Sequence, residues 1–280
     1  MLDVTPITTN IGADIAGVDL TDLSDQVFAA IYGCWLDHQV IRFRDQRLDD
    51  DQLQAFSRRF GPLERAPLGF LSEAERERVD NPYVTVISNI RQDGKPIGGL
   101  GNAEAIWHSD MTYLETPPPA SVLLAIEVPS RGGDTYFASQ YGAYESLPAP
   151  LRERVAGLSI KHDAAHTSIG RLRPGYAAFD DPREAPGAVH PMVQRHAETG
   201  RTCLYLGRRD YAYVPGLELA DSEALLDELW RYAALPEYVM VQSWRPGDLV
   251  VWDNRCVLHR RDGFDDAERR LMKRCQVLAA

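Results

Sequence analysis

His108 and Asp110 lie two residues apart in the stretch Trp107-His108-Ser109-Asp110. Side chains on an extended segment alternate faces with a period of two, so this imidazole and this carboxylate can point the same way. Both side chains can therefore reach one metal ion. A third candidate ligand, His259, lies far downstream, shortly after Trp252-Asp253-Asn254-Arg255.

Two imidazoles and one carboxylate on one face of a metal form the facial triad of non-haem iron(II) oxygenases. This arrangement leaves open positions for a co-substrate and O2. A His-x-Asp pair alone is weak, because a chain with seven histidines can contain one by chance. The alternative is that His108, Asp110 and His259 are surface or hydrogen-bonding polar residues.

Two arginines, Arg270 and Arg274, follow His259. If His259 ends one strand and the segment from Leu271 to Val277 returns beside it, both guanidiniums can point back toward the metal. A planar fork of donors is suited to binding carboxylates through two hydrogen bonds. One arginine could hold a dicarboxylic keto acid and the other an acidic substrate. Arg270 could instead cap a sheet edge or pair with Glu268.

The chain resembles the taurine / 2,4-dichlorophenoxyacetate family of iron(II)- and 2-oxoglutarate-dependent dioxygenases, most closely its phenoxyacetate branch. The resemblance covers roughly residues 10 to 278. Its blocks, in the family's order, are Phe60-Gly61-Pro62-Leu63-Glu64, Trp107-His108-Ser109-Asp110, Gly132-Gly133-Asp134-Thr135, His190-Pro191-Met192-Val193, Thr199-Gly200-Arg201 and Trp252-Asp253-Asn254-Arg255 with His259 and the two arginines.

The resemblance implies a mostly β fold with flanking helices, a double-stranded β-helix (jelly roll). It implies that His108, Asp110 and His259 bind Fe(II), and that 2-oxoglutarate and O2 are co-substrates. Thr135 and Arg270 would bind the distal carboxylate of 2-oxoglutarate, and Arg274 the acidic group of the substrate. Otherwise, Thr135 simply fills a strand after a Gly-Gly turn. A homo-oligomer is also implied.

The substrate implied by this family is a small organic acid, such as an aryloxyalkanoate-, sulfonate- or amino-acid-like anion. Hydroxylation, with cleavage of the hydroxylated product, is the expected reaction. The taurine enzyme has a histidine soon after its Phe-Gly block, but this chain continues Arg65-Ala66-Pro67-Leu68-Gly69-Phe70, and Ala164 replaces a pocket phenylalanine. A bulkier or more apolar acid than taurine is therefore expected.

Two other outcomes stay open from the sequence. The same iron and 2-oxoglutarate chemistry could give desaturation or another oxidation, although Asp110 argues against halogenation, in which a small residue replaces the carboxylate. A non-catalytic jelly-roll metal-binding protein is the alternative from a different class, because a fold alone does not fix function.

The remaining histidines have simpler interpretations. His162 and His166 have the i, i+4 spacing of a helical zinc site, but the glutamate of a His-Glu-x-x-His protease is missing and no helix is expected there. Each imidazole could line the substrate pocket or make a hydrogen bond within a loop. His190 and His196 are expected to be structural, and Trp107, Trp252 and Asn254 to shape and support the site.

Composition fits one domain over residues 1–280, with 44% hydrophobic and 25% charged residues. The net charge of −11 argues against nucleic acid and anionic membranes as partners. Four scattered cysteines indicate free thiols, not a disulfide framework. Neither a signal peptide nor a run of about 18 apolar residues is visible, so a cytoplasmic protein is expected.

Short strands and a few helices must position these residues. Expected helices are Asp25–Trp35, Asp50–Phe60, Tyr141–Leu158 and Ser222–Leu235, the last with Ser222 as its N-cap. Expected strands are Ile11–Asp19, Val40–Phe43, Val84–Ile87, Val122–Val128, Val239–Trp244, Leu249–Trp252 and Arg274–Leu278. Glycine-rich Gly94–Gly101 is expected to be a mobile loop, and 90–104 and 159–190 to be lid or insertion segments near the site.

Overall fold

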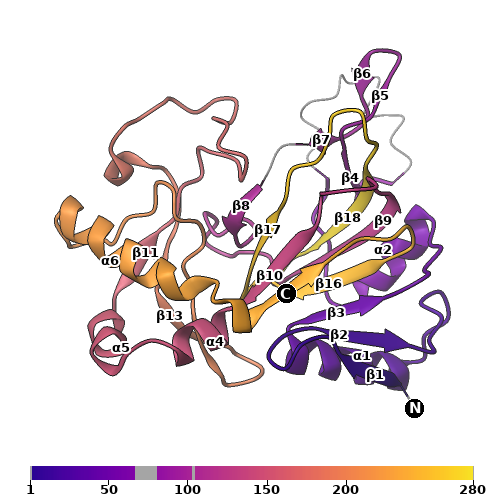
Figure 1. Ribbon diagram of the computed structural model, residues 1–280, viewed down its shortest axis with the longest axis horizontal. Coiled ribbons are helices and arrows are strands. Elements are labelled where there is room, and N and C mark those ends of the chain that lie inside the picture. The colour runs from indigo at the N-terminus through magenta and orange to yellow at the C-terminus, as the bar shows by residue number, and fades with distance from the viewer. Residues whose placement is uncertain (1, 67–80, 103–104, 280) are drawn as a thin grey trace.

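Two β-sheets that face each other form the centre of the protein, and helices cover both outer sides (Figure 1). The computed structural model describes residues 2–66, 81–102 and 105–279. No helix in these ranges is long and apolar enough to cross a membrane. The expectation of many strands with helices packed outside them is confirmed.

The larger sheet has eight strands and is mostly antiparallel. Their spatial order is β1 (Asp3–Pro6), β2 (Ala13–Ala16), β3 (Val40–Phe43), β16 (Leu249–Asp253), β9 (Ala120–Glu127), β18 (Leu271–Val277), β4 (Thr85–Ser88) and β7 (Gly99–Leu100). Only the pairs β2–β3 and β4–β7 are parallel within this sheet of the described chain.

The smaller sheet has four strands, in the order β15 (Val239–Gln242), β10 (Thr135–Ser139), β17 (Val257–Arg261) and β8 (Ala105–His108). Three two-stranded ribbons are formed by β5 (Arg91–Gln92) with β6 (Lys95–Pro96), β11 (Ser159–Lys161) with β12 (Val189–Pro191), and β13 (Val193–Arg195) with β14 (Thr202–Leu204). The helices are α1 (Asp25–His38), α2 (Asp50–Arg58), α4 (Gln140–Glu145), α5 (Ala149–Val155) and α6 (Leu219–Ala233), with short 3-10 turns η2 (Pro182–Glu184) and η3 (Pro236–Tyr238).

Alternation along the strands of the large sheet divides its side chains between two apolar layers. On the outer face, Val122 and Leu124 of β9 pack with Trp35 of α1 and Phe56 of α2. On the inner face, Leu123 and its neighbours pack against the small sheet. The central strands β16 and β9 are therefore buried on both sides, which explains why their sequences are almost continuously apolar.

The inner layer joins the two sheets through large side chains. Phe137 of β10, Met240 of β15 and Trp252 of β16 are each at most 2% exposed and belong to one cluster. Behind the small sheet, α4, α5 and α6 cover Ala138 and Leu258 in a third cluster. The metal-ligand candidates lie at the edge of the inner layer.

Two helix predictions were wrong in detail. The single helix expected over Tyr141–Leu158 is two helices, because the chain is extended at Pro148 (ψ 146°), which is the N-cap of the second helix; Pro150 is tolerated in the first turn of that helix. The last helix begins at Leu219, so Ser222 lies inside α6 and is not its N-cap. The Ser222 hydroxyl instead accepts a hydrogen bond from the backbone N–H of Val214 at 2.9 Å.

The glycine-rich segment before the first ligand is more regular than expected. Arg91 to Pro96 form a β-hairpin whose turn contains Asp93 (φ +49°) and Gly94 (φ +75°). Positive φ at both turn residues is the geometry that two-residue hairpins favour. The rest of the segment pairs with the large sheet through β7, and residues 103 and 104 lie outside the described residues.

Candidate active site

The structure brings His108, Asp110 and His259 together. Strand β8 ends at His108, and His259 lies opposite it on β17 in the small sheet. Asp110 lies in the turn after β8, not on the strand as the alternation argument assumed. The nearest Asp110 oxygen, Oδ1, is 3.7 Å from Nε2 of His108 and 3.8 Å from Nε2 of His259.

Hydrogen bonds fix which atoms of this group remain available. Nδ1 of His108 lies 2.7 Å from the carbonyl oxygen of Ile106, so Nδ1 carries the proton and Nε2 keeps its lone pair. Oδ2 of Asp110 accepts a hydrogen bond from the Ser121 hydroxyl at 2.8 Å. The free lone pairs of Asp110 Oδ1 and of the two Nε2 atoms therefore converge, as metal binding requires.

The protonation states also suit a metal. Burial, with a smaller contribution from His108, lowers the pKa of His259 to about 3, so its imidazole is neutral at physiological pH. Burial alone would raise the pKa of Asp110, but Arg274 and the two imidazoles outweigh burial and lower this pKa below its ordinary value of 3.8. An ionised carboxylate and a neutral imidazole are the forms that bind metal ions.

A chain of buried hydrogen bonds supports Asp110 from behind. The indole N–H of Trp252 donates to Asn254, and the Asn254 amide donates to the Ser121 hydroxyl at 3.1 Å. Gln276 donates to the same hydroxyl at 2.7 Å. The expected supporting role of Trp252 and Asn254 agrees with these contacts. The sequence did not identify Ser121 and Gln276 as supporting residues. A single Ser or Gln on a strand carries no signal that it will hydrogen-bond near a ligand from a distant part of the chain.

These ligands open into a cavity of about 500 Å³ between the two sheets. All six residues assigned from the sequence line it, namely His108, Asp110, Thr135, His259, Arg270 and Arg274. Val86, Ile87 and Leu123 make one wall apolar, and residues of the segment 159–190 make another wall polar. The cavity is large enough for a small organic molecule.

Arg270 and Thr135 both line the cavity, and Arg261 pairs with Thr135 across neighbouring strands. Arg270 is 2% exposed and its Nε has no hydrogen-bond partner among the described residues. Burial, and secondly the neighbouring charge of Arg261, lower the pKa of Arg270 to about 9. The Thr135 hydroxyl oxygen accepts a hydrogen bond from the indole N–H of Trp244 at 2.9 Å. A buried cation with an unused donor suggests an anionic ligand.

The alternative pairing of Arg270 with Glu268 is wrong. Glu268 accepts hydrogen bonds from the backbone and hydroxyl of Ser130 on the surface. Arg261, which the sequence argument also missed, lines the cavity beside Arg270. Its position two residues after His259, on the same face of β17, is the signal that could have identified it.

Arg274 approaches the metal group from the large sheet. Its Nη1 lies 3.5 Å from Oδ2 of Asp110. Arg269 and Lys273 point elsewhere, since Arg269 pairs with Glu127 and Lys273 with Asp50. The assumed return of the chain beside His259 is incorrect, because β17 and β18 belong to different sheets. The arginines reach the site across the interior instead.

Three other histidines, His162, His166 and His190, lie near this cavity but do not belong to the first group. His162 and Asp163 line the cavity, while Nδ1 of His166 donates a hydrogen bond to Oδ2 of Asp163 at 2.9 Å. His190 lies 2.9 Å from two backbone carbonyl oxygens, in agreement with a structural role. His162 and His166 are not on a helix, which agrees with the argument against a protease zinc site.

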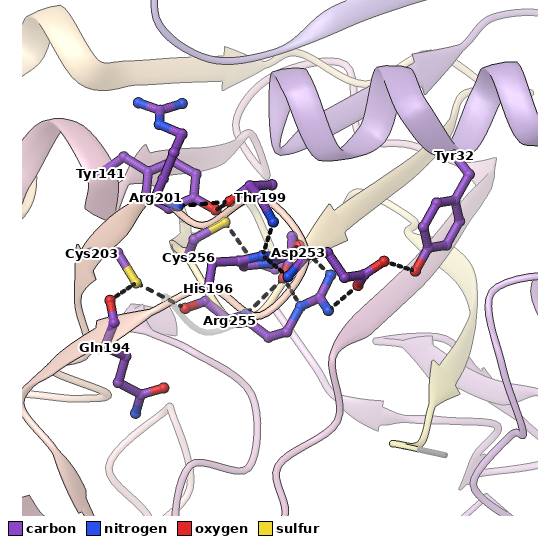
Figure 2. Close-up of polar contacts among 11 residues, drawn as sticks. Tyr32, Tyr141, Gln194, His196, Thr199, Arg201, Cys203, Asp253, Arg255 and Cys256 are labelled. Carbon is purple, nitrogen blue, oxygen red and sulfur yellow. Dashed lines mark hydrogen bonds and ion pairs between the residues drawn. The ribbon is translucent and has the colours of Figure 1, made fainter.

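A second group with metal-ligand chemistry, His196, Asp253 and Cys256, does not fit a metal (Figure 2). His196 Nε2 lies 3.0 Å from Asp253, and His196 Nδ1 accepts two backbone N–H groups. Arg255 donates to both oxygens of Asp253, at 2.8 and 2.7 Å. Burial raises the pKa of the Cys256 thiol well above 9. The nitrogen and oxygen lone pairs are already used, so this group is a structural network.

The comparisons with known proteins agree with this geometry. The family model described as "Taurine catabolism dioxygenase TauD, TfdA family" matches residues 3–276. The chain belongs to this family. It is 35% identical to "(S)-phenoxypropionate/alpha-ketoglutarate-dioxygenase" of Sphingobium herbicidovorans, over 96% of this chain and 92% of the relative.

Two further matches extend this result. A 2,4-dichlorophenoxyacetate dioxygenase of Cupriavidus pinatubonensis, also alpha-ketoglutarate-dependent, is 37% identical over 85% of this chain and 84% of the relative. Among solved structures, the fold matches the crystal structure of AAD-2 in complex with Mn(II) and N-oxalylglycine, with a TM-score of 0.81. The two sequences are 26% identical, and the match covers 100% of this chain and 98% of that chain. The protein is therefore a non-haem iron dioxygenase that depends on 2-oxoglutarate (alpha-ketoglutarate) and O2.

Proposed function

We propose that His108, Asp110 and His259 hold the iron(II) ion as a facial triad. The observation that carries this proposal is the convergence of two imidazole nitrogens and one carboxylate oxygen, within 4.8 Å of one another, at the wall of the cavity. The donor set is the one that non-haem iron oxygenases use. Bound iron would supply the activation of O2 and the oxidation of the substrate.

Arg270 and Thr135 are assigned to the distal carboxylate of 2-oxoglutarate. A buried guanidinium whose Nε has no partner among the described residues can give charge-assisted hydrogen bonds to a carboxylate, and the Thr135 hydroxyl lines the same cavity. Arg261 adds a second positive charge beside Arg270. The dicarboxylate would thereby be oriented with its keto acid end toward the triad.

Arg274 is assigned to the acidic group of the substrate. Because Arg274 lies beside Asp110, an acid bound to it would be held next to the triad. The apolar wall formed by Val86, Ile87 and Leu123 suits a hydrocarbon or aromatic body. Together with the relatives named for phenoxypropionate and dichlorophenoxyacetate, this favours an aryloxyalkanoate-like acid over sulfonate- or amino-acid-like anions.

The reaction proposed is hydroxylation of that acid next to its ether or other leaving group, followed by breakdown of the hydroxylated product. The protein's own residues bind and orient the two acids. We further assign residues 1–280 to one catalytic domain with a double-stranded β-helix core. Gly99 of the segment 90–104, and Thr167 and Arg173 of the segment 159–190, line the cavity, as lid segments would.

Anaerobic titration tests the proposed site. Iron(II) and 2-oxoglutarate added to the protein should produce a visible charge-transfer absorption band. The band should be absent from His259→Ala, and Arg270→Ala should need more 2-oxoglutarate to produce it. A band of unchanged strength in His259→Ala would contradict the assignment of the triad.

A further inference from the structure

Arg173 is a half-buried arginine in the wall of the substrate cavity, contributed by the segment 159–190. Its guanidinium carbon lies 4.7 Å from the centre of the Tyr113 ring, and its Nε donates to the carbonyl oxygen of His166 at 3.3 Å. These two contacts hold the guanidinium in place but do not neutralise it. Within residues 2–66, 81–102 and 105–279, Arg173 forms no ion pair with a carboxylate.

Two other arginines that line the cavity, Arg208 and Arg274, lie beside carboxylates of the protein. Arg208 pairs with Asp163 at 2.5 Å. Arg274 lies near Asp110 and also in the electrostatic field of Glu64, which lines the same cavity. The positive charge of Arg274 is therefore partly balanced by Asp110 before any substrate acid arrives. A second cation would compensate for Glu64.

Tyr113 connects Arg173 to the triad side of the cavity. Burial raises the pKa of Tyr113; Arg173 lowers it, while Glu64 and Asp110 raise it. Tyr113 and Arg173 line the same cavity as Glu64 and Asp110, and the Arg173 guanidinium lies over the Tyr113 ring. An arginine that lies over an aromatic ring is held in place by the ring. The N–H donors in the plane of its guanidinium stay available to a ligand.

We propose that Arg173 is a substrate-binding residue that holds the acidic group of the substrate together with Arg274. This inference rests on the proposed function and adds a second cation to its substrate site. The ligand class is an amphiphilic monoacid, a carboxylate or sulfonate on an apolar body. The acid faces the two arginines, and the apolar body faces Val86, Ile87 and Leu123.

A comparison of phenoxyacetate with its uncharged analogue phenoxyacetamide, in binding and in turnover, tests this assignment. In Arg173→Gln the KM for the acid should rise on the order of 10- to 100-fold, as expected for the loss of hydrogen bonds to a charged group. Binding of the amide should change little. Arg173→Lys should restore part of the acid affinity, because it restores the charge. The Kd for 2-oxoglutarate should stay as in the wild type.

Arg171→Gln is the matched control, since Arg171 is an exposed arginine in the same loop and does not line the cavity. Its KM for phenoxyacetate should equal that of the wild type. Tyr113→Leu removes the stacking surface and should weaken acid binding, whereas Tyr113→Phe keeps the ring and should retain most of it. The two Tyr113 variants test whether the ring positions the guanidinium, whereas the Arg173 variants test the charge of the guanidinium.

Two outcomes would overturn the inference. One is an unchanged acid KM in Arg173→Gln; the other is an equal loss of acid and amide binding, which would indicate a packing role. Calorimetric titration of phenoxyacetate into Mn(II)-loaded protein measures the Kd for the acid without turnover. If the wild type fails to bind 2-oxoglutarate, the proposed function fails, yet this titration still decides whether Arg173 binds acids.

Discussion

Asp110 shows how single residues make this site. It lies in a turn whose next residue, Met111, has a φ of +54°, and its Oδ2 is fixed by Ser121 while Oδ1 faces both imidazoles. The spacing His-x-Asp predicted that the two side chains would meet. The turn and the supporting hydroxyl could not be predicted, because Ser121 is distant in sequence and unremarkable in type.

Ser121→Ala should lower metal affinity by roughly 10- to 100-fold, the usual effect of removing a partner that orients a ligand. The Ser121 hydroxyl is buried and joins Asp110 to Asn254 and Gln276. Equilibrium titration with Mn(II) would measure the change. Ser130→Ala, which removes a surface hydroxyl bound to Glu268, serves as control. Equal Mn(II) affinities in Ser121→Ala and the wild type would show that Ser121 does not position Asp110.

Arg270→Lys should raise the KM for 2-oxoglutarate by about tenfold or more, because an ammonium keeps the charge but loses the two-donor fork. The KM for the acidic substrate should change much less. Arg269→Lys is the control, since Arg269 is the adjacent arginine but pairs with Glu127 on the surface. Steady-state kinetics with varied 2-oxoglutarate give both values. An unchanged 2-oxoglutarate requirement would remove Arg270 from the co-substrate site.

At the scale of elements, a buried network ties together parts of the chain that are distant in sequence. Asp253 at the end of β16 binds His196, from the loop between β13 and β14, and Arg255. Arg255 also pairs with Glu198 at 2.5 Å, and Glu198 accepts a hydrogen bond from Tyr32 of α1 (Figure 2). The network anchors the turn between β16 and β17, and β17 carries His259.

Asp253→Asn should lower the free energy of unfolding by about 3–5 kcal/mol at neutral pH, as loss of one partner of a buried ion pair does. Burial raises the pKa of Asp253, but the bonds from His196 and Arg255 outweigh it, so the pKa in the folded protein is below 3.8. A depressed pKa adds stability above the unfolded pKa and loses it as pH falls. The difference in the free energy of unfolding between the wild type and Asp253→Asn should therefore be constant above about pH 5 and shrink below about pH 4.

Urea unfolding of both proteins from pH 3 to pH 7 would measure this difference. Asp262→Asn is a suitable control, since Asp262 pairs with Arg260 in a half-buried position away from the network. A difference that stays constant down to pH 3 would mean that the charge of Asp253 does not stabilise the fold.

The elements were predictable where local signals were strong. Strand Val40–Phe43 was predicted correctly, because its residues are mostly apolar and favour strands. The start of α1 at Asp25 was also correct, and Ser24 caps the helix there. The Asp93-Gly94 hairpin was missed although Asp-Gly is a strong turn signal, because the many glycines suggested a loop. The helix over 141–158 failed at its prolines, which the apolar pattern obscured.

At the scale of the molecule, the site depends on two sheets facing each other. The small sheet contributes His108 and His259, and the large sheet contributes Arg274 from β18. The sequence suggested that β17 and β18 were neighbours, but sheet partners depend on contacts between distant segments. The family resemblance, rather than any local pattern, allowed the six site residues to be grouped before the structure showed them in one cavity.

Ligands that contact both sheets should stabilise the whole protein. Mn(II) and 2-oxoglutarate together, each at about 100 times its Kd, should add roughly 2.7 kcal/mol or more to the free energy of unfolding. For a chain of this size this corresponds to a rise in Tm of about 5–10 °C. Differential scanning fluorimetry would measure the rise. 2-Oxoglutarate without metal should give a much smaller rise, and equal rises with and without metal would contradict the joint site.

The central claim is that this cavity couples decarboxylation of 2-oxoglutarate to oxidation of a small organic acid. The most direct measurement is succinate formation by the iron(II)-loaded protein in air, across aryloxyalkanoates, sulfonates and N-substituted amino acids, with a control lacking substrate. We predict strong stimulation by at least one aryloxyalkanoate and no succinate from His259→Ala. No succinate from folded, iron-loaded wild-type protein, or undiminished succinate from His259→Ala, would contradict the account.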